Sequence, residues 1–318
     1  MIPTLAVRGL KIAFRTDAGP AAVLDDVTLT LEKRQVLGVV GESGCGKSTL
    51  IRAILGILPP ATRVNAGEII FEGENLLAFT EAELNQRIRG SRIGFIPQDP
   101  LLSLNPVFKV GTQMLEIMRD HAPRGTNRRD HIARLVHLLT RLRVPDPAAA
   151  LERYPHQFSG GQRQRLLIAA ALACAPGLII ADEPTTALDV TTQQEILTLL
   201  RELVDELDVS LLFVTHDLGV VAELCDALCV IYAGQTVESG PVRTVLNAPG
   251  HPYTQALLAC HPERAAAFVG IPGTVPSPFR MPPGCRFGPR CAYREPVCSA
   301  ALPAVVHAGT DVRCIRAA

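Results

Sequence analysis

The sequence predicts an α/β fold with an inserted helical subdomain and a small cysteine-containing module at its C-terminal end. Three observations support this prediction. Apolar β-like runs alternate with helical patterns, the stretch from about 99 to 175 is mainly helical, and four of the nine cysteines fall in the last 34 residues of the chain. We therefore expect an α/β domain over residues 1–260, its helical subdomain at about 99–175, and a C-terminal extension over residues 261–318.

The N-terminal part has the pattern of strands that lead into a loop and a helix. Leu5–Phe14 and Val23–Leu31 are rich in alternating apolar residues, and the turn-forming residues 17–20 separate them. The short apolar run Gln35–Val40 ends at a glycine-rich loop. Beyond that loop, apolar residues recur at helical spacing up to Leu55. The pattern predicts a strand, a loop and a helix in that order.

The glycine-rich loop fits the P-loop pattern, and it reads Gly41-Glu42-Ser43-Gly44-Cys45-Gly46-Lys47-Ser48-Thr49. Glycines let backbone N–H groups curl around phosphates, Lys47 reaches the β- and γ-phosphates, and the Ser48 hydroxyl can ligate Mg²⁺. A glycine-rich turn without a ligand is the alternative, which the flanking strand and helix disfavour. Because Cys45 lies among backbone donors and beside Lys47, we expect a lowered pKa for its thiol.

The remainder of the first 260 residues changes from α/β to helical and back. Helical stripes begin at Ile132 and at Ser159, and a third runs from Ile196 to Leu207. The expected strands here are Gly67–Phe71, Ile93–Ile96, Leu178–Ala181, Leu211–Val214 and Ala227–Tyr232.

Two acidic residues follow one of these buried strands. Asp182 and Glu183 come directly after Leu178–Ala181. A carboxylate that follows an apolar strand beside a P-loop provides a second ligand of Mg²⁺. We assign this role to Asp182. Glu183 is then placed to polarise the attacking water. Without the P-loop, a solvated loop would be the better interpretation of this pair.

A second glycine-containing motif precedes a helix rich in Ala and Leu, and it reads Phe158-Ser159-Gly160-Gly161-Gln162. Ser159 could be only an N-cap, and the glycines only a turn. The same features also make a second phosphate-binding helix terminus, and one nucleotide does not need two of these from one chain.

With these motifs the sequence resembles the ABC transporter ATPases over about 260 residues. The resemblance implies a head-to-tail dimer in which Ser159, Gly160, Gly161 and Gln162 complete the ATP site of the opposite subunit. It assigns Gln98 to the loop that senses Mg²⁺ and water, Asp189 of Ala187-Leu188-Asp189 to the loop at the dimer interface, and His216 to the γ-phosphate. Phe14 is the candidate for stacking on adenine, with an ordinary strand aromatic as the alternative.

Longer segments are similar to the dipeptide, oligopeptide and nickel branch of the ABC importers. These segments are residues 97–100, 103–106, 154–157, 183–191 and 250–254, with residues 282–285 and 289–291 in the tail. The resemblance implies peptide import, with a related or identical second ATPase, two membrane permeases and a solute-binding protein, at the cytoplasmic face of the cell membrane. Nickel or another small solute, a phosphonate-degradation complex and a repair or translation factor are the alternatives.

The composition argues against nucleic acid as a partner. The chain has 31 basic and 31 acidic residues, no Trp and 4% aromatic residues, so we expect no nucleic-acid partner. The N-terminus lacks the pattern of a signal peptide. The most apolar stretch, Leu166–Ala181, is interrupted by Pro176-Gly177 and is too short to span a bilayer.

The tail cysteines form a candidate metal site, and they are Cys285, Cys291, Cys298 and Cys314. Four thiolates can hold a tetrahedral zinc ion or a 4Fe–4S cluster, and the spacing does not choose between these or no metal at all. The resemblance favours an iron–sulfur cluster, because some ATPases of this branch carry one in the tail. Nothing in the sequence places this tail near the P-loop.

Overall fold

The computed structural model describes residues 2–122, 125–186, 188–260, 270–300, 306–307 and 309–317. The chain forms two compact units, one made of Met1–Leu77 with Val214–Ala318 and one made of residues 78–213. Each unit contains helices and strands, as the predicted α/β class requires. The predicted domain boundaries at 99, 175 and 260 differ from these unit boundaries and stay predictions.

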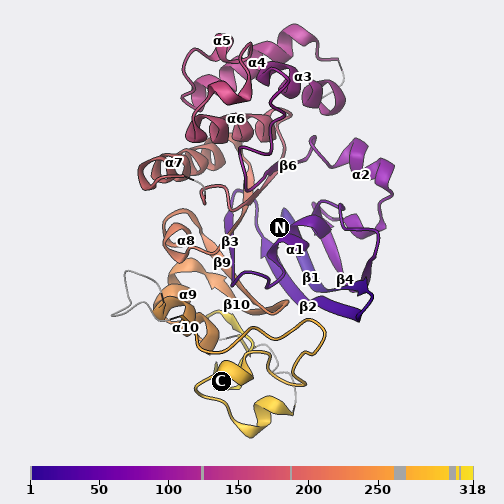
Figure 1. The fold of residues 1–318 in the computed structure, drawn as a ribbon, viewed down its shortest axis with the longest axis vertical. Coiled ribbons are helices and arrows are strands. Elements are labelled where there is room, and N and C mark those ends of the chain that lie inside the picture. Colours follow the sequence, from indigo (N-terminus) through magenta and orange to yellow (C-terminus); the bar gives the residue numbers. More distant parts are fainter. Residues whose placement is uncertain are drawn as a thin grey trace. The chain divides into compact units, whose positions relative to one another are not determined.

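The first unit contains an antiparallel sheet in the order β2-β1-β4-β5. Its strands are β1 (Leu5–Thr16), β2 (Gly19–Leu31), β4 (Thr62–Phe71) and β5 (Glu74–Asn75). Leu5 pairs with Leu31 on one side and with Phe71 on the other, and all three side chains are buried. Figure 1 shows β1, β2 and β4 side by side. The alternating apolar pattern of the sequence thus forms one buried sheet face.

The same unit holds further strands in the order β11-β12-β10-β9-β3. Their bounds are β3 (Val36–Val40), β9 (Ala227–Tyr232), β10 (Gln235–Pro241), β11 (Val306–His307) and β12 (Asp311–Val312). β3 runs parallel to β9, and β10 is antiparallel to both β9 and β12. Since Glu238 of β10 pairs with Val312 of β12, the C-terminal residues extend a sheet of the P-loop unit.

The helices of the first unit are short. They are α1 (Lys47–Ile54), α8 (Leu218–Leu224), α9 (Val242–Asn247) and α10 (Pro252–Ala259), and the tail adds 3-10 turns at Gly288–Arg290, Pro296–Ser299 and Ile315–Ala317. His251 caps α10 by accepting from Tyr253 N–H at 3.0 Å through its Nδ1. Pro289 and Pro296, at the start of the first two of these turns, fit the fixed φ of a first helical position.

The second unit is mainly helical. Its elements are α2 (Glu81–Arg87), β6 (Ile93–Ile96), α3 (Val110–His121), α4 (Arg128–Arg141), α5 (Pro147–Ala150), a 3-10 turn at Pro155–Gln157, α6 (Gly160–Leu172), β7 (Leu178–Asp182) and α7 (Val190–Leu207). β6 runs parallel to β7. The boundary between the units falls within β8 (Ser210–Thr215).

The first helix of the predicted helical subdomain begins later than expected. Helix α3 starts at Val110, whereas residues 99–109 form turns and bends. Asp99 accepts hydrogen bonds from the N–H groups of Leu101 and Leu102 at 2.7 and 3.3 Å, which is an Asx-type turn. Pro100 and Pro106 further disfavour a helix. In the described part of the chain, no helix is long and apolar enough to cross a membrane.

Candidate nucleotide-binding site

The P-loop connects β3 to α1 in the order that the sequence predicts. Gly44 and Gly46 have φ values of +79° and +108°, which L-residues rarely adopt. A Cβ at Gly41 would lie 2.1 Å from the Ile231 carbonyl oxygen, so only glycine fits there. The loop therefore needs its glycines for a curled backbone, which exposes N–H groups to a bound anion.

Lys47 is buried and held over the loop by main-chain oxygens. Its Nζ donates to the carbonyl oxygen of Gly41 at 2.6 Å and to that of Glu42 at 3.3 Å. The neighbouring Ser48 is exposed at the start of α1. A cation and a hydroxyl thus lie together at a helix N-terminus, where phosphate and a divalent ion bind well.

The expectation of a lowered pKa for Cys45 was wrong. The side chain is 1% exposed, and this burial raises the pKa of the thiol. The neighbouring positive charge of Lys47 lowers the pKa by a smaller amount, because desolvation of the thiolate is the larger effect. Cys45 is therefore a packed apolar group of the loop.

Glu42 has partners that the local sequence did not indicate. Its backbone N–H donates to the hydroxyl of Tyr253 at 2.9 Å, and its carboxylate accepts two hydrogen bonds from Arg290, at 2.7 and 3.0 Å. Tyr253 belongs to α10 and Arg290 to the tail. Both are far from the P-loop in sequence, and the segments that contain them, 250–254 and 289–291, gave no indication of a contact with Glu42.

Two further predicted residues belong to the first unit. Phe14 is half-buried on β1, where it pairs with Ala21 and Thr62. His216 is exposed directly after β8, and Asp217 caps the following helix α8. Both side chains are accessible to a ligand, and their assigned roles stay predictions.

In the second unit, Glu183 has a strained backbone at the end of β7. Its φ of +45° is uncommon for a residue with a side chain. The carboxylate accepts hydrogen bonds from Gln98 Nε2 at 3.3 Å and from Thr186 Oγ1 at 3.1 Å. Asp182 precedes it and is half-buried. The structure therefore joins Gln98 and Glu183, which lie 85 positions apart in the sequence.

Ser159 is the N-cap of α6, as one of the two interpretations of its motif requires. Its hydroxyl accepts from Gln162 N–H at 3.3 Å, and the Gln162 side chain accepts from Ser159 N–H at 3.1 Å. Ser159 and Gly160 are both exposed, so this capped terminus also stays accessible to an anion. The two interpretations are compatible.

Thr192 connects this motif to the loop at Asp189. A Cβ at Gly161 would lie 2.5 Å from the Thr192 methyl group, and Thr192 Oγ1 donates to Asp189 at 2.7 Å. Asp189 also caps α7 by accepting from Thr192 N–H at 3.0 Å. Ala187 of the same predicted loop lies outside the described residues.

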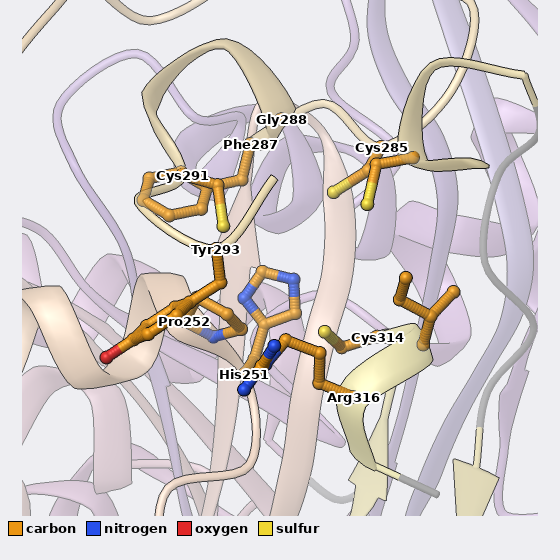
Figure 2. A pocket seen from close by; sticks show the side chains of 11 residues that line it. His251, Pro252, Cys285, Phe287, Gly288, Cys291, Tyr293, Cys314 and Arg316 are labelled. Atoms are coloured by element: carbon orange, nitrogen blue, oxygen red, sulfur yellow. The ribbon is translucent and has the colours of Figure 1, made fainter. Parts of the chain in front are cut away.

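The four tail cysteines line one pocket, and none of them forms a disulfide. Figure 2 shows Cys285, Cys291 and Cys314 around the His251 ring. Burial raises the pKa of Cys285 and Cys314, so these thiols are protonated at neutral pH. Within the described residues, no three His, Cys, Asp or Glu side chains are arranged to hold a metal ion. The structure therefore brings the four predicted cysteines to one pocket, and the iron–sulfur or zinc site itself stays a prediction.

His251 contributes a buried polar atom to this pocket. Its side chain is 1% exposed, and burial lowers its pKa to about 3, so the ring is neutral. Since Nδ1 accepts from the Tyr253 N–H, the proton resides on Nε2. Among the described residues, Nε2 has no hydrogen-bond partner. A buried donor of this kind usually has an acceptor, which is a protein group, a water or a ligand.

Comparison with family models gives two matches along the chain. Residues 24–186 match the ABC transporter family, and residues 237–298 match the oligopeptide/dipeptide transporter C-terminal region. A provisionally named peptide import ATP-binding protein of Brucella melitensis is 45% identical over 299 residues, covering 93% of this chain and 89% of the relative. A similarly named protein of Brucella ovis is 44% identical over 330 residues, covering 99% and 97%.

Solved structures give the same picture for the fold. A dimeric ATP-binding cassette in a post-hydrolysis state with ADP and phosphate aligns with a TM-score of 0.66 at 25% identity, covering 75% of this chain and 99% of that one. An ATP-binding subunit of an ABC transporter aligns with a TM-score of 0.60 at 25% identity, covering 76% and 91%.

Proposed function

The chain belongs to the ATP-binding subunits of the ABC transporters, and from this membership we propose that it powers the import of dipeptides or oligopeptides through partner permeases. As a member of this family it is an ATPase that converts ATP and water to ADP and phosphate. The observation that carries the peptide assignment is the match of residues 237–298 to the C-terminal region of oligopeptide and dipeptide transporters. The names of the relatives support the same cargo.

In this proposal, residues 41–49 bind ATP. The curled backbone donates N–H groups to the phosphates, and Lys47 exchanges its main-chain partners for phosphate oxygens. Phe14 stacks on the adenine ring from β1, a role that its partial exposure allows.

Ser48, Gln98 and Asp182 are the residues that would hold Mg²⁺. All three provide oxygen ligands, which this ion prefers, and Ser48 and Gln98 are exposed while Asp182 is half-buried. When bound, Mg²⁺ neutralises part of the charge on the phosphates.

Glu183 is the proposed general base. Its carboxylate is oriented by Gln98 and Thr186, so it can accept a proton from a water that attacks the γ-phosphate. His216 contacts the γ-phosphate in this scheme and stabilises the charge that develops on it.

The N-terminus of α6 serves the nucleotide of a partner subunit. Residues Ser159, Gly160, Gly161, Gln162 and Asp189 make up this contribution. The exposed residues Ser159 and Gly160 at a capped helix terminus support it, and so does the dimeric state of a solved relative. The partner is a second ABC ATPase, identical to this chain or related to it.

The tail pocket is proposed to hold a 4Fe–4S cluster through Cys285, Cys291, Cys298 and Cys314. The shared pocket and the buried Nε2–H of His251, which could donate to a sulfur, support it. A bound cluster would supply a structural crosslink or a redox centre.

The transporter also needs two membrane permeases and a solute-binding protein, and the chain would then work at the cytoplasmic face of the cell membrane. The test is an assembled complex in proteoliposomes with its solute-binding protein outside. We expect peptide to stimulate ATP hydrolysis, and Lys47→Ala to abolish it. Stimulation of ATP hydrolysis by nickel alone would show that the cargo is the metal ion and not a peptide. Purification without permeases, in a complex of soluble enzymes, would contradict a role in transport.

A further inference from the structure

Arg290 of the tail fixes an acidic residue within the P-loop. Its Nη1 and Nη2 donate to the two carboxylate oxygens of Glu42 at 2.7 and 3.0 Å, which is a bidentate pair. The Arg290 side chain is 3% exposed and that of Glu42 is 28% exposed. The bond to Glu42 raises the pKa of the Arg290 guanidinium.

All five N–H groups of Arg290 have acceptors. Besides Glu42, they are the carbonyl oxygen of Pro272 at 2.9 Å, that of Ile271 at 3.0 Å and the hydroxyl of Tyr232 at 3.3 Å. The guanidinium therefore cannot turn away from Glu42 without losing bonds elsewhere. Such full satisfaction is what a buried charge requires.

The main chain of Glu42 is held in addition to its side chain. Its N–H donates to Tyr253, and its carbonyl oxygen accepts from Lys47 Nζ. Tyr253 packs against Tyr232 and Phe287, with ring centroids 4.5 and 5.4 Å apart. Phe287 lies three residues before Arg290, so the aromatic cluster and the ion pair join the tail to the same point of the loop.

An acidic residue in a phosphate-binding loop has an electrostatic consequence. Glu42 directly follows Gly41, and the carbonyl oxygen of Gly41 accepts a hydrogen bond from Lys47 Nζ. Left unpaired, its negative charge would repel the phosphates of ATP. Paired with Arg290, it is neutralised and leaves the field of Lys47 and of the α1 N-terminus dominant.

The geometry points to Arg290 as a positioning residue of the ATP site: by pairing with Glu42, the C-terminal tail sets the charge and shape of the P-loop and thereby the affinity for nucleotide. This inference rests on the proposed role of residues 41–49 in binding ATP. It makes the tail a part of its own chain's nucleotide site.

The test measures the Kd of a fluorescent ATP analogue, mant-ATP, without Mg²⁺ on the full-length protein. We expect Arg290→Ala to weaken binding on the order of tenfold, the effect of one unpaired charge about 12 Å from a phosphate charge at an effective dielectric constant of about 20. Arg290→Lys should be intermediate, because it keeps the charge but not the five bonds. Adding Glu42→Gln to Arg290→Ala should restore affinity to within about threefold, because the unpaired carboxylate is removed.

Arg313→Ala is the matched control. Arg313 is also a tail residue with a 10% exposed side chain, and it pairs at 2.7 Å with Asp26 of β2, which is not a residue of the loop. Urea unfolding without nucleotide should show both alanine variants to be less stable, while only Arg290→Ala loses affinity.

Each outcome decides a separate point. Equal losses of affinity in Arg313→Ala and Arg290→Ala, or no rescue by Glu42→Gln, would overturn the inference in favour of a general stability effect. Unchanged affinity in Arg290→Ala would overturn it too. Wild-type protein that binds no mant-ATP, with a Kd no tighter than that of Lys47→Ala, would overturn the proposed ATP site itself.

Discussion

At the residue scale, Glu183 combines an uncommon backbone conformation with an oriented carboxylate. Its φ is +45°, and Gln98 and Thr186 donate to the same oxygen. We expect Glu183→Gln to retain ATP binding, because the side chain keeps its size and loses only its basicity. ATP turnover by the assembled transporter should fall on the order of 10²–10⁴-fold, the usual effect of losing a positioned general base.

A second acidic residue of the same unit provides the control for this prediction. Glu202 of α7 forms a surface ion pair with Arg143 at 3.2 Å. Glu202→Gln should leave turnover unchanged, because such pairs contribute little. Near-normal hydrolysis in Glu183→Gln, measured beside this control, would remove Glu183 from the role of base.

The residues that sequence alone could assign are those with local patterns. The glycines and Lys47 of the P-loop stand at fixed spacing, because the phosphate cradle is made by consecutive backbone groups. Arg290 has no such spacing, since it meets Glu42 across 248 positions. The direction of the pKa shift of Cys45 was predicted wrongly for a related reason. Its burial depends on packing from distant segments, which no local pattern encodes.

At the element scale, helices α6 and α7 approach each other closely at one glycine. We expect Gly161→Ala to lower the free energy of unfolding by about 1–3 kcal/mol, because its Cβ would lie 2.5 Å from the Thr192 methyl group. Adding Thr192→Ser should restore most of the loss. Serine lacks the methyl group and keeps the hydroxyl that donates to Asp189. Urea unfolding measures both, and a double variant no more stable than the single one would contradict this packing.

The strands and long helices could be predicted because each has a buried apolar face with its own period. Leu135, Leu138 and Leu139 of α4 are buried at helical spacing, and the strand Val36–Val40 is buried throughout. Helix α10 and strand β10 were not predicted. Tyr253 of α10 packs on Phe287 of the tail and β10 pairs with β12, so both elements depend on residues far along the chain.

The tail pocket is the element with the most direct chemical test. Protein purified without oxygen should be brown and contain about four iron and four acid-labile sulfide atoms per chain. Cys291→Ser should lower the iron content and the colour. Cys174→Ser should change neither, because Cys174 lies in the other unit, where burial raises its pKa to about 11. Colourless protein with one zinc ion per chain would replace the cluster by zinc, and protein without metal would end the metal proposal.

At the scale of the whole molecule, the proposed dimer divides each ATP site between two chains. The P-loop and the α6 terminus of one chain would then serve different nucleotides, which is why a single chain carries two phosphate-binding helix termini. This pairing of two chains was predicted from the family resemblance, because the sequence of one chain does not show how two copies pair. A mixing experiment separates the shared site from a site built within one chain.

Two inactive variants should restore each other if the site is shared. Lys47→Ala removes the P-loop cation, and Ser159→Arg blocks the α6 terminus with a large side chain. In a mixed dimer, one site contains both changes and the other contains neither, so mixing should recover up to about a quarter of wild-type ATP turnover if chains pair at random and each site acts alone. If each site lay within one chain, every site would keep one defect. ATPase assays on mixtures that crosslinking confirms as dimers decide between the two, and a mixture as inactive as its components would place Ser159 beside the nucleotide of its own chain.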